Sequence, residues 1–179
     1  MQPVFQENSM IKHLNLLLFF GLLLLANGCC YSFKGISIDP DVKTFFVQNF
    51  ETDASNAPPT LAVEITEKLK DKIRLESRLN LKNTDADVEF KGRVTEYRVV
   101  PVAPKPGETV ALNRLEVGFS VQFINNKNDK KSWPSARTFR HFGEFSNTAD
   151  LLSVQDQLLR ETIFPQILED IFNAAFNDW

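Results

Sequence analysis

LEVGFSVQF, residues 115–123, alternates an apolar side chain with a polar or small one at every step. Successive side chains of a β-strand point to opposite faces, so a period of two predicts a strand with one buried face and one wet face. A sheet of this kind buries its apolar face against a second layer of structure. The stretch therefore predicts an antiparallel sheet that something else in the chain must cover.

Residues 87–99, upstream of this strand, also have the composition of a strand. One face of this segment carries Val88, Phe90, Gly92 and Val94. The alternation then slips, so that Tyr97 and Val99 follow the opposite phase. One extra residue in a strand produces such a slip, which predicts a β-bulge near residues 95–96.

A further strand is predicted over residues 137–145, although its alternation is less regular. Residues 101–108, with three prolines and a glycine, predict a loop between the strand over residues 87–99 and the strand over residues 115–123. Residues 125–131 predict a polar turn between the latter strand and residues 137–145. Strands joined by such connections commonly pair as neighbours. The three strands therefore predict an antiparallel meander.

An amphipathic helix is predicted over residues 61–78, with Thr60 as its N-cap. Its apolar stripe recurs every four residues, at Leu61, Ile65, Leu69 and Ile73. Before it, residues 42–50 (VKTFFVQNF) are rich in β-branched and aromatic side chains, which is typical of a strand.

A second helix is predicted from Ser153 to the C-terminus. Its apolar stripe consists of Phe164, Leu168, Ile171 and Ala175. Ser153 and Asp156 resemble a capping box, with Asp in place of the usual Glu. Pro165 lacks a backbone N–H and should kink this helix.

The predicted order is therefore β-α-β-β-β-α. Each helix and the sheet have one apolar side, which must be buried against the apolar side of another element. The fold class that satisfies all of them is an α+β two-layer sandwich, with two helices packed on one face of a roughly four-stranded sheet.

The N-terminus has the features of a lipoprotein signal peptide over residues 1–28. An apolar run over residues 14–26 follows Lys12, and it is shorter than the roughly 20 residues that a transmembrane helix needs. The run ends in Leu-Ala-Asn-Gly before Cys29, which resembles the cleavage site of lipoprotein signal peptidase. We expect lipidation of Cys29, a true start at either Met1 or Met10, and a single domain over residues 29–179.

Composition excludes several classes of site in that domain. Both cysteines, Cys29 and Cys30, lie at the end of the apolar run, so the domain has no internal disulfide and no thiol nucleophile. The net charge of -3 gives no general attraction to nucleic acid. Phosphate-binding and dinucleotide-binding glycine loops, zinc-binding helices and nucleophile elbows are missing from the sequence. We therefore expect no catalytic residue, no cofactor, no metal and no nucleic-acid partner.

One basic cluster is a candidate binding site for phosphates or acidic sugars. Its members flank or lie on the segment 125–145, and they are Lys127, Lys130, Lys131, Arg137, Arg140 and His141. The alternative is a hairpin that charged residues keep soluble.

Two weaker candidates have simpler explanations. Asp85, Asp87 and Glu89 alternate along one strand and could hold a cation, but a solvated strand start explains them better. The sixteen phenylalanines could line a site for an apolar ligand, but most fall at positions predicted to face the core.

Several segments of the chain resemble the LptE family of lipopolysaccharide-assembly lipoproteins, in its Bacteroidetes form. No single motif is specific, but their order and spacing together are. The segments are CCYSFKG at 29–35, PDVKT at 40–44, PPTL at 58–61, PVA at 101–103, NRL at 113–115 and EDIFN at 169–173. The order β-α-β-β-β-α also agrees with the sheet and two helices of that family.

This resemblance implies an outer-membrane, periplasm-facing lipoprotein that is not an enzyme. The family plugs an LptD-type β-barrel, helps that barrel to assemble, and engages lipopolysaccharide on its way to the outer leaflet. Residues 30–33 (CYSF) contain no Asp after Cys29 that would favour inner-membrane retention. The alternative is a periplasmic lipoprotein that binds an apolar ligand or another outer-membrane barrel.

Overall fold

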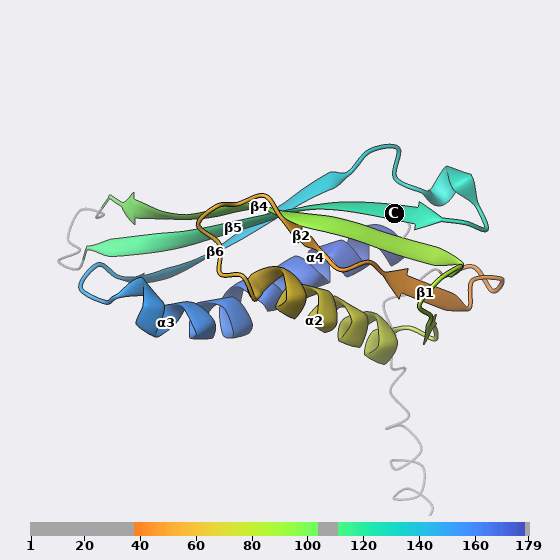
Figure 1. The fold of residues 1–179 in the computed structure, drawn as a ribbon, viewed down its shortest axis with the longest axis horizontal. Helices are drawn as coiled ribbons and strands as arrows, with labels where there is room; N and C mark the ends of the chain where they lie inside the picture. Colours follow the sequence, from red (N-terminus) through yellow and green to blue (C-terminus); the bar gives the residue numbers. More distant parts are fainter. Residues whose placement is uncertain (1–37, 104–110, 178–179) are drawn as a thin grey trace, which may run out of the picture. The chain divides into compact units, whose positions relative to one another are not determined.

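The computed structural model describes residues 38–103 and 111–177. The signal peptide and Cys29 lie outside these ranges. The described chain is an α+β fold with helices on one side of a sheet, as predicted (Figure 1). The sheet has six strands instead of roughly four, and it is mixed, because two strands of only two residues add to it and the first strand runs parallel to its neighbours. The strands are β1 (Thr44–Val47), β2 (Glu51–Thr52), β3 (Asn80–Leu81), β4 (Val88–Val102), β5 (Leu112–Asn125) and β6 (Arg137–Ser146). The helices are α2 (Leu61–Glu76), α3 (Leu151–Gln157) and α4 (Phe164–Phe176), with a short 3₁₀ helix η1 (Asp129–Lys131) and a π-helical segment η2 (Leu158–Ile163).

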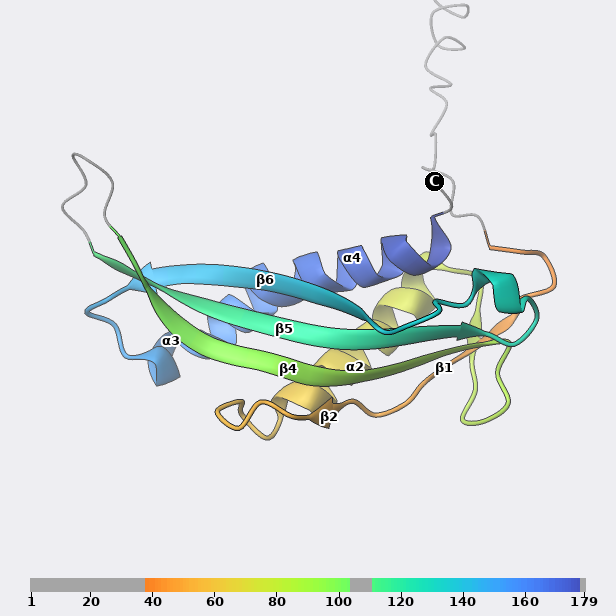
Figure 2. The same cartoon turned by 90° about the horizontal axis from the view of Figure 1, so that it is seen from above.

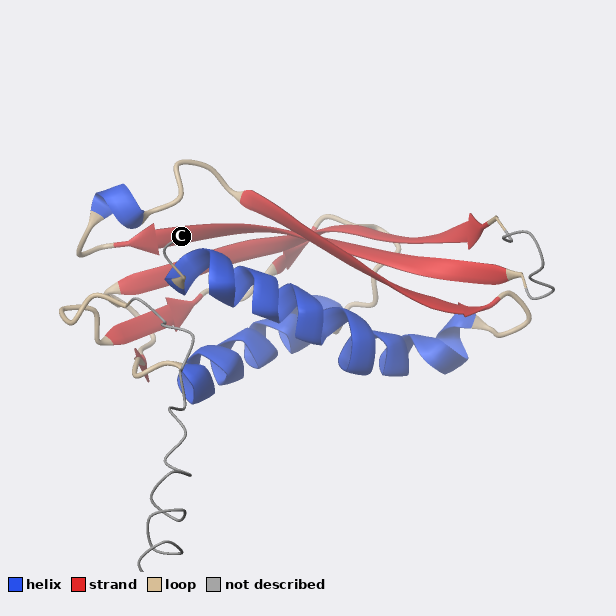
Figure 3. Cartoon of the chain, turned by 180° about the vertical axis from the view of Figure 1, so that it is seen from behind, coloured by secondary structure: helices blue, strands red, loops and turns tan. Residues whose placement is uncertain are grey.

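The sheet has the strand order β3-β1-β4-β5-β6. The long strands β4, β5 and β6 form the predicted antiparallel meander and lie side by side in Figure 2. Strand β1 runs parallel to β4 and to β3, while β2 pairs with β4 further along the same edge. The helices lie together on one face of this sheet (Figure 3), which leaves the other face open.

The strand predicted over residues 42–50 is interrupted in the structure. Strand β1 ends at Val47, and the chain then turns Phe50 inward, where its N–H donates to Thr66 Oγ1 at 3.0 Å. The Phe50 ring lies directly over Gly92 of β4. A Cβ at Gly92 would overlap Phe50 Cζ, so only glycine leaves room for the ring.

The β-bulge predicted near residues 95–96 is confirmed. Val94 pairs with Phe119, but the next pair is Glu96 with Gly118, so Thr95 is the extra residue. The slip returns Tyr97 to the helix-covered face, where it is buried and its hydroxyl donates to Gln155 Oε1 of α3 at 2.8 Å. Without the extra residue Tyr97 would point to the open face.

Strand β4 continues two residues into the segment that was predicted as a loop. Pro101 pairs with Asn113 and Val102 with Leu112. Proline is tolerated in an edge strand, where its missing N–H faces away from the ladder. No described residue pairs with the other side of β4 there, so the proline removes no ladder hydrogen bond.

The first helix, α2, confirms the predicted stripe and ends at Glu76, two residues earlier than expected. Leu61, Ile65, Leu69 and Ile73 are all buried. Thr60 precedes the helix, but its side chain makes no capping hydrogen bond. That part of the prediction was wrong because Thr60 itself has helical backbone angles.

The C-terminal helix begins at Leu151 after Asp150, and the predicted capping box does not form. The Ser153 hydroxyl instead donates to the Asp150 carbonyl at 2.6 Å. The helix is interrupted before Pro165, as expected, because proline cannot donate to the preceding turn. The irregularity takes the form of the π-helical segment η2, after which α4 continues with Pro165 in its first turn.

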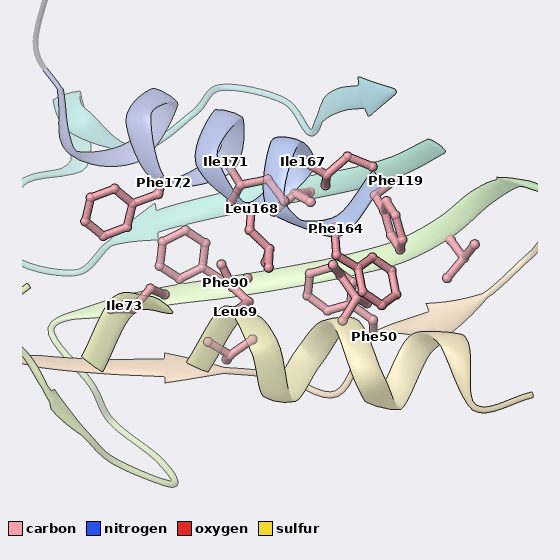
Figure 4. Packing of buried hydrophobic residues seen from close by; sticks show 14 of the residues in the cluster. Phe50, Leu69, Ile73, Phe90, Phe119, Phe164, Ile167, Leu168, Ile171 and Phe172 are labelled. Atoms are coloured by element: carbon pink, nitrogen blue, oxygen red, sulfur yellow. The ribbon is translucent and has the colours of Figure 1, made fainter. Parts of the chain in front are cut away.

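The apolar core fills the space between the sheet and the helices, with Phe90, Phe164 and Ile171 among its central residues (Figure 4). Phe90 contacts Phe123 with ring centroids 5.0 Å apart and Phe176 at 5.9 Å. The buried phenylalanines of the described chain are Phe45, Phe50, Phe90, Phe119, Phe123, Phe145, Phe164, Phe172 and Phe176. Core packing therefore accounts for most of the phenylalanines that the structure describes.

Asp87 joins the start of β4 to the start of β1. Its Oδ2 accepts hydrogen bonds of 2.9 Å from the N–H groups of Lys43 and Thr44 and from the Thr44 hydroxyl. These bonds, led by the one from the Lys43 backbone, lower the pKa of Asp87 to about 2. The carboxylate is therefore a structural tie between two strands.

Replacement Asp87→Ala is expected to lower the free energy of unfolding by about 2 kcal/mol at pH 7, because hydrogen bonds to a charged acceptor are lost. The pKa of Asp87 is depressed in the folded state, so its contribution is complete above the unfolded pKa of about 4 and is lost as the pH falls toward 2. Urea unfolding at pH 7 and at pH 2.5 measures this. The loss of free energy of unfolding in Asp87→Ala, relative to wild type, should be smaller at pH 2.5 than at pH 7. Asp41 is exposed, so Asp41→Ala should change this free energy little at either pH. An Asp87→Ala loss that is the same at both pH values would contradict the structural role of the carboxylate.

Candidate ligand-binding surface

The predicted basic cluster is divided by the pairing of β5 and β6. His141 pairs with Val117 and so faces the helices, whereas Arg140 pairs with Gly118 and faces the open side of the sheet. Arg137 pairs with Val121 and lies on the same side as His141. The strand alternation therefore sends neighbouring residues of the cluster to opposite faces.

The three lysines lie together at the turn between β5 and β6, around η1. Buried Asn125 shapes this turn, since its Oδ1 accepts from the N–H groups of Lys127 and Asn128 at 2.9 Å. Lys127 Nζ lies 3.3 Å from an Asp87 carboxylate oxygen, and Lys131 Nζ lies 3.1 Å from Asp39. Lys130 is exposed, and within residues 38–103 and 111–177 its ammonium has no ion-pair partner.

Arg137 and His141 are held against the helix side by specific contacts. The Arg137 guanidinium lies over the Trp133 ring, 4.6 Å from its centroid, in a cation–π contact. His141 Nε2 lies 2.6 Å from Asp170 Oδ2 of α4. This contact ties β6 to the C-terminal helix, which gives His141 a structural role.

Arg140 belongs to a charged network on the open face that the sequence did not predict. Its Nε donates to Glu96 at 2.8 Å, and Glu96 also accepts from Arg98, which bonds Glu116 at 2.8 Å. A shallow depression of about 460 Å³ lies here. Its lining residues are Glu96, Arg98, Glu116, Arg140, His141 and Phe142. Only the register of the three strands, including the bulge, brings these residues together.

The described residues show no arrangement typical of metal binding. No group of three or more His, Cys, Asp or Glu side chains in residues 38–103 and 111–177 could hold a metal ion. Asp87 is bonded to β1, and Glu89 accepts from Asn126 Nδ2 at 3.0 Å. In the same part of the chain, no helix is both long and apolar enough to cross a membrane.

Comparison with solved structures finds similar chains at low sequence identity. The hypothetical protein CT253 from Chlamydia trachomatis matches with a TM-score of 0.51 and 9% identity, over 75% of this chain and 98% of that one. A minor lipoprotein from Acinetobacter baumannii matches with a TM-score of 0.45 and 13% identity, over 73% of this chain and 90% of that one. No curated protein sequence matches the chain.

The sequence itself matches the model of one protein family, LptE, described as lipopolysaccharide-assembly, over residues 42–175. This range begins just before β1 and ends within α4, so it includes every strand of the sheet and most of the helical layer. The chain therefore belongs to the LptE family of lipopolysaccharide-assembly proteins.

Proposed function

We propose that this chain is an outer-membrane lipoprotein, anchored through Cys29 and facing the periplasm. In this role it assembles with an LptD-type β-barrel, plugs the barrel lumen and helps to insert lipopolysaccharide into the outer leaflet. Its contribution is binding and assembly, without a catalytic step. The family match over residues 42–175 is the observation that carries the proposal.

The N-terminal sequence supports the membrane anchor. A short apolar run follows Lys12 and ends at Cys29, in the order that lipoprotein signal peptides have. A domain that is anchored by lipid needs no membrane-spanning helix of its own. The anchor would hold the domain at the membrane surface where an outer-membrane barrel is assembled.

Purification of the full-length chain from its native membrane in mild detergent tests this function. We expect a large outer-membrane barrel protein in roughly equal molar amount, together with lipopolysaccharide, when the eluate is analysed by mass spectrometry. An anchored chain that elutes without barrel or glycolipid would contradict the assembly role. A different barrel in equal amount would contradict the LptD-type partner.

The basic cluster is our proposal for the lipopolysaccharide contact. The lysines around η1 form its best-defined part, because Lys127, Lys130 and Lys131 are grouped on one turn and Lys130 has no ion-pair partner in the described chain. Lipopolysaccharide carries phosphates, and ammonium groups bind phosphate as point charges. Arg137, Arg140 and His141 lie on β6 beyond this turn. Arg140 is on the open face and the other two are on the helix side, so a ligand would reach all three only around the β6 edge of the sheet.

The double reversal Lys130→Glu/Lys131→Glu is expected to weaken binding of lipopolysaccharide by the purified chain roughly tenfold, since each reversal replaces attraction with repulsion. Equilibrium binding of labelled lipopolysaccharide at low salt measures the change. Lys82→Glu/Lys91→Glu is the matched control, because it makes the same change of charge at two exposed lysines outside the turn. Lys82 directly follows β3, and Lys91 lies on β4. Equal losses in the two variants would show that only net charge matters.

A further inference from the structure

The depression on the open face of the sheet is formed by three strands. The helices lie behind the sheet in Figure 2, so this view looks onto the open face. The residues at the depression come from two adjacent rows across the strands. These are Glu96, Gly118 and Arg140 in one row, and Arg98, Glu116 and Phe142 in the next. The volume of about 460 Å³ is within the range of small-molecule sites.

Gly118 leaves space between the side chains of the first row. A Cβ at this position would lie 3.1 Å from Glu96 Cβ and 3.3 Å from Arg140 Cγ, so even a methyl group would crowd both neighbours. The bulge at Thr95 produces the register in which Glu96 lies beside this glycine. Bulges commonly re-aim a side chain next to a functional site. The glycine and the bulge together make a hollow in a face that side chains would otherwise cover.

The depression offers hydrogen-bond donors and acceptors that its own contacts leave unused. Glu96 fixes the two arginines, because its Oε1 lies 2.8 Å from Arg98 Nε and its Oε2 accepts from Arg140 Nε at 2.8 Å. Arg140 makes no other hydrogen bond to the described residues, so both of its Nη groups can donate to a ligand. Arg98 bonds Glu116 through Oε2, and Glu116 Oε1 accepts from no described residue. These groups therefore have defined positions and spare bonding capacity.

The charges of the depression balance, which limits the kind of ligand that it fits. Two arginines face two glutamates, so an isolated phosphate or carboxylate meets no excess of positive charge. A sugar hydroxyl, in contrast, can donate to a carboxylate and accept from a guanidinium.

Phe142 adds an apolar surface to this polar site. Its side chain is 46% exposed, and the Arg114 guanidinium, 3.9 Å from the centre of the ring, fixes the orientation of that ring. The C–H face of a sugar can pack on an aromatic ring while its hydroxyls bond to polar groups beside the ring. Donors, acceptors and one exposed aromatic ring together match a saccharide.

We propose that this depression binds a sugar unit of lipopolysaccharide, with the hydroxyls at Arg140 and Glu116 and the C–H face against Phe142. The inference rests on the proposed function, because that function supplies the glycolipid. The interior of an outer-membrane barrel is polar, so the saccharide is the part of the glycolipid that suits a single plug inside it. Asn125, at the turn that carries the lysines, lies about 24 Å along β5 from Gly118, so the sugar site is distinct from that turn.

Titration of a lipid-free saccharide into the full-length chain in mild detergent tests the proposal. The probe is the oligosaccharide that mild acid releases from lipopolysaccharide of the same membrane, after removal of its phosphates. We expect a dissociation constant of about 1 mM, since an open depression covers only part of its ligand. NMR spectra should show shifts of the Gly118 amide and of the Arg140 Nε–H signal. An increase of NaCl from about 50 to about 300 mM should change the affinity less than about twofold, because the site has no net charge.

Two substitutions remove different parts of the site. Phe142→Ala removes the ring and Arg140→Gln removes the guanidinium, and each should weaken binding roughly fivefold through the loss of an aromatic or hydrogen-bonding contact. Both positions are exposed, so the fold should be retained, which circular dichroism checks. Leu75→Ala and Arg74→Gln are the matched controls. Leu75 is an exposed apolar residue of α2, and Arg74 pairs with Asp71 on the same helix.

Four results would overturn the sugar site. They are the absence of shifts at about 10 mM oligosaccharide, equal losses in the control variants, displacement of the oligosaccharide by inorganic phosphate, and preferential binding of a cell-wall disaccharide. Purification from the native membrane decides the proposed function separately. A barrel and lipopolysaccharide that purify with a chain unable to bind the saccharide would overturn the sugar site alone. A chain that binds the saccharide but purifies without a barrel would support the site and contradict the assembly role.

Discussion

Replacement Cys29→Ser is expected to abolish incorporation of labelled palmitate and to release the chain from the membrane. Each buried CH₂ group contributes about 0.8 kcal/mol to membrane affinity, so two or three acyl chains anchor a protein almost permanently. A serine cannot accept the thioether-linked lipid that a lipoprotein cysteine carries. The described domain has no helix of sufficient length and apolarity to replace that anchor. Fractionation after a salt wash, together with autoradiography, measures both effects.

Cys30→Ser is the matched control for this experiment, because it changes the adjacent thiol and nothing else. We expect it to retain the label and the membrane fraction of the wild type. Loss of the label in Cys30→Ser, with retention in Cys29→Ser, would move the anchor by one residue. Retention in both would contradict the assignment of Cys29 as the lipidated residue. Absence of the label from the wild type would contradict the lipoprotein assignment, while leaving the family membership unaffected.

Phe90→Ala is expected to lower the free energy of unfolding by about 3–5 kcal/mol, which is the typical cost of truncating a buried phenylalanine. Phe90 has no exposed surface and packs against Phe123 of the neighbouring strand and Phe176 of α4. Its removal leaves a cavity between the two layers and breaks two aromatic contacts, each of which adds to the stability. We expect the Tm to fall by about 10–15 °C in a domain of this size.

Leu152→Ala is the control for this prediction. Leu152 is 74% exposed on α3, so its truncation should change the free energy of unfolding by less than about 0.5 kcal/mol. Thermal and urea unfolding of both variants, followed by circular dichroism, give the comparison. Similar losses in the two variants would contradict the position of the core between β4 and α4.

Local patterns in the sequence were sufficient to predict most of the elements. The alternation over residues 115–123 became the centre of β5, and the apolar stripe of residues 61–73 became the buried face of α2. The slip after Val94 predicted the bulge, because a strand that must keep its apolar side inward can change phase only by an extra residue. These features depend on residues close in the chain, which is why one sequence predicts them.

Other details depended on contacts between distant residues. The first strand is shorter than predicted because the chain turns Phe50 inward. This turn requires two residues of other elements: Gly92, which has no side chain to collide with the Phe50 ring, and Thr66, whose hydroxyl accepts from the Phe50 N–H. The two-residue strands β2 and β3 are too short to have a pattern of their own. Pro101 is compatible with β4 only because its side of the strand is an edge of the sheet.

By itself, the sequence determined the α+β class, the antiparallel meander and the lipoprotein-like N-terminus, since periodicity and composition are local properties. The tertiary structure decided which residues meet. It divided the basic cluster between two faces, joined Arg140 and Arg98 through Glu96, and placed β6 at one end of the strand order. The physical reason is that strand register and bulge position determine which side chains share a face, and pairing between strands far apart in the chain sets that register.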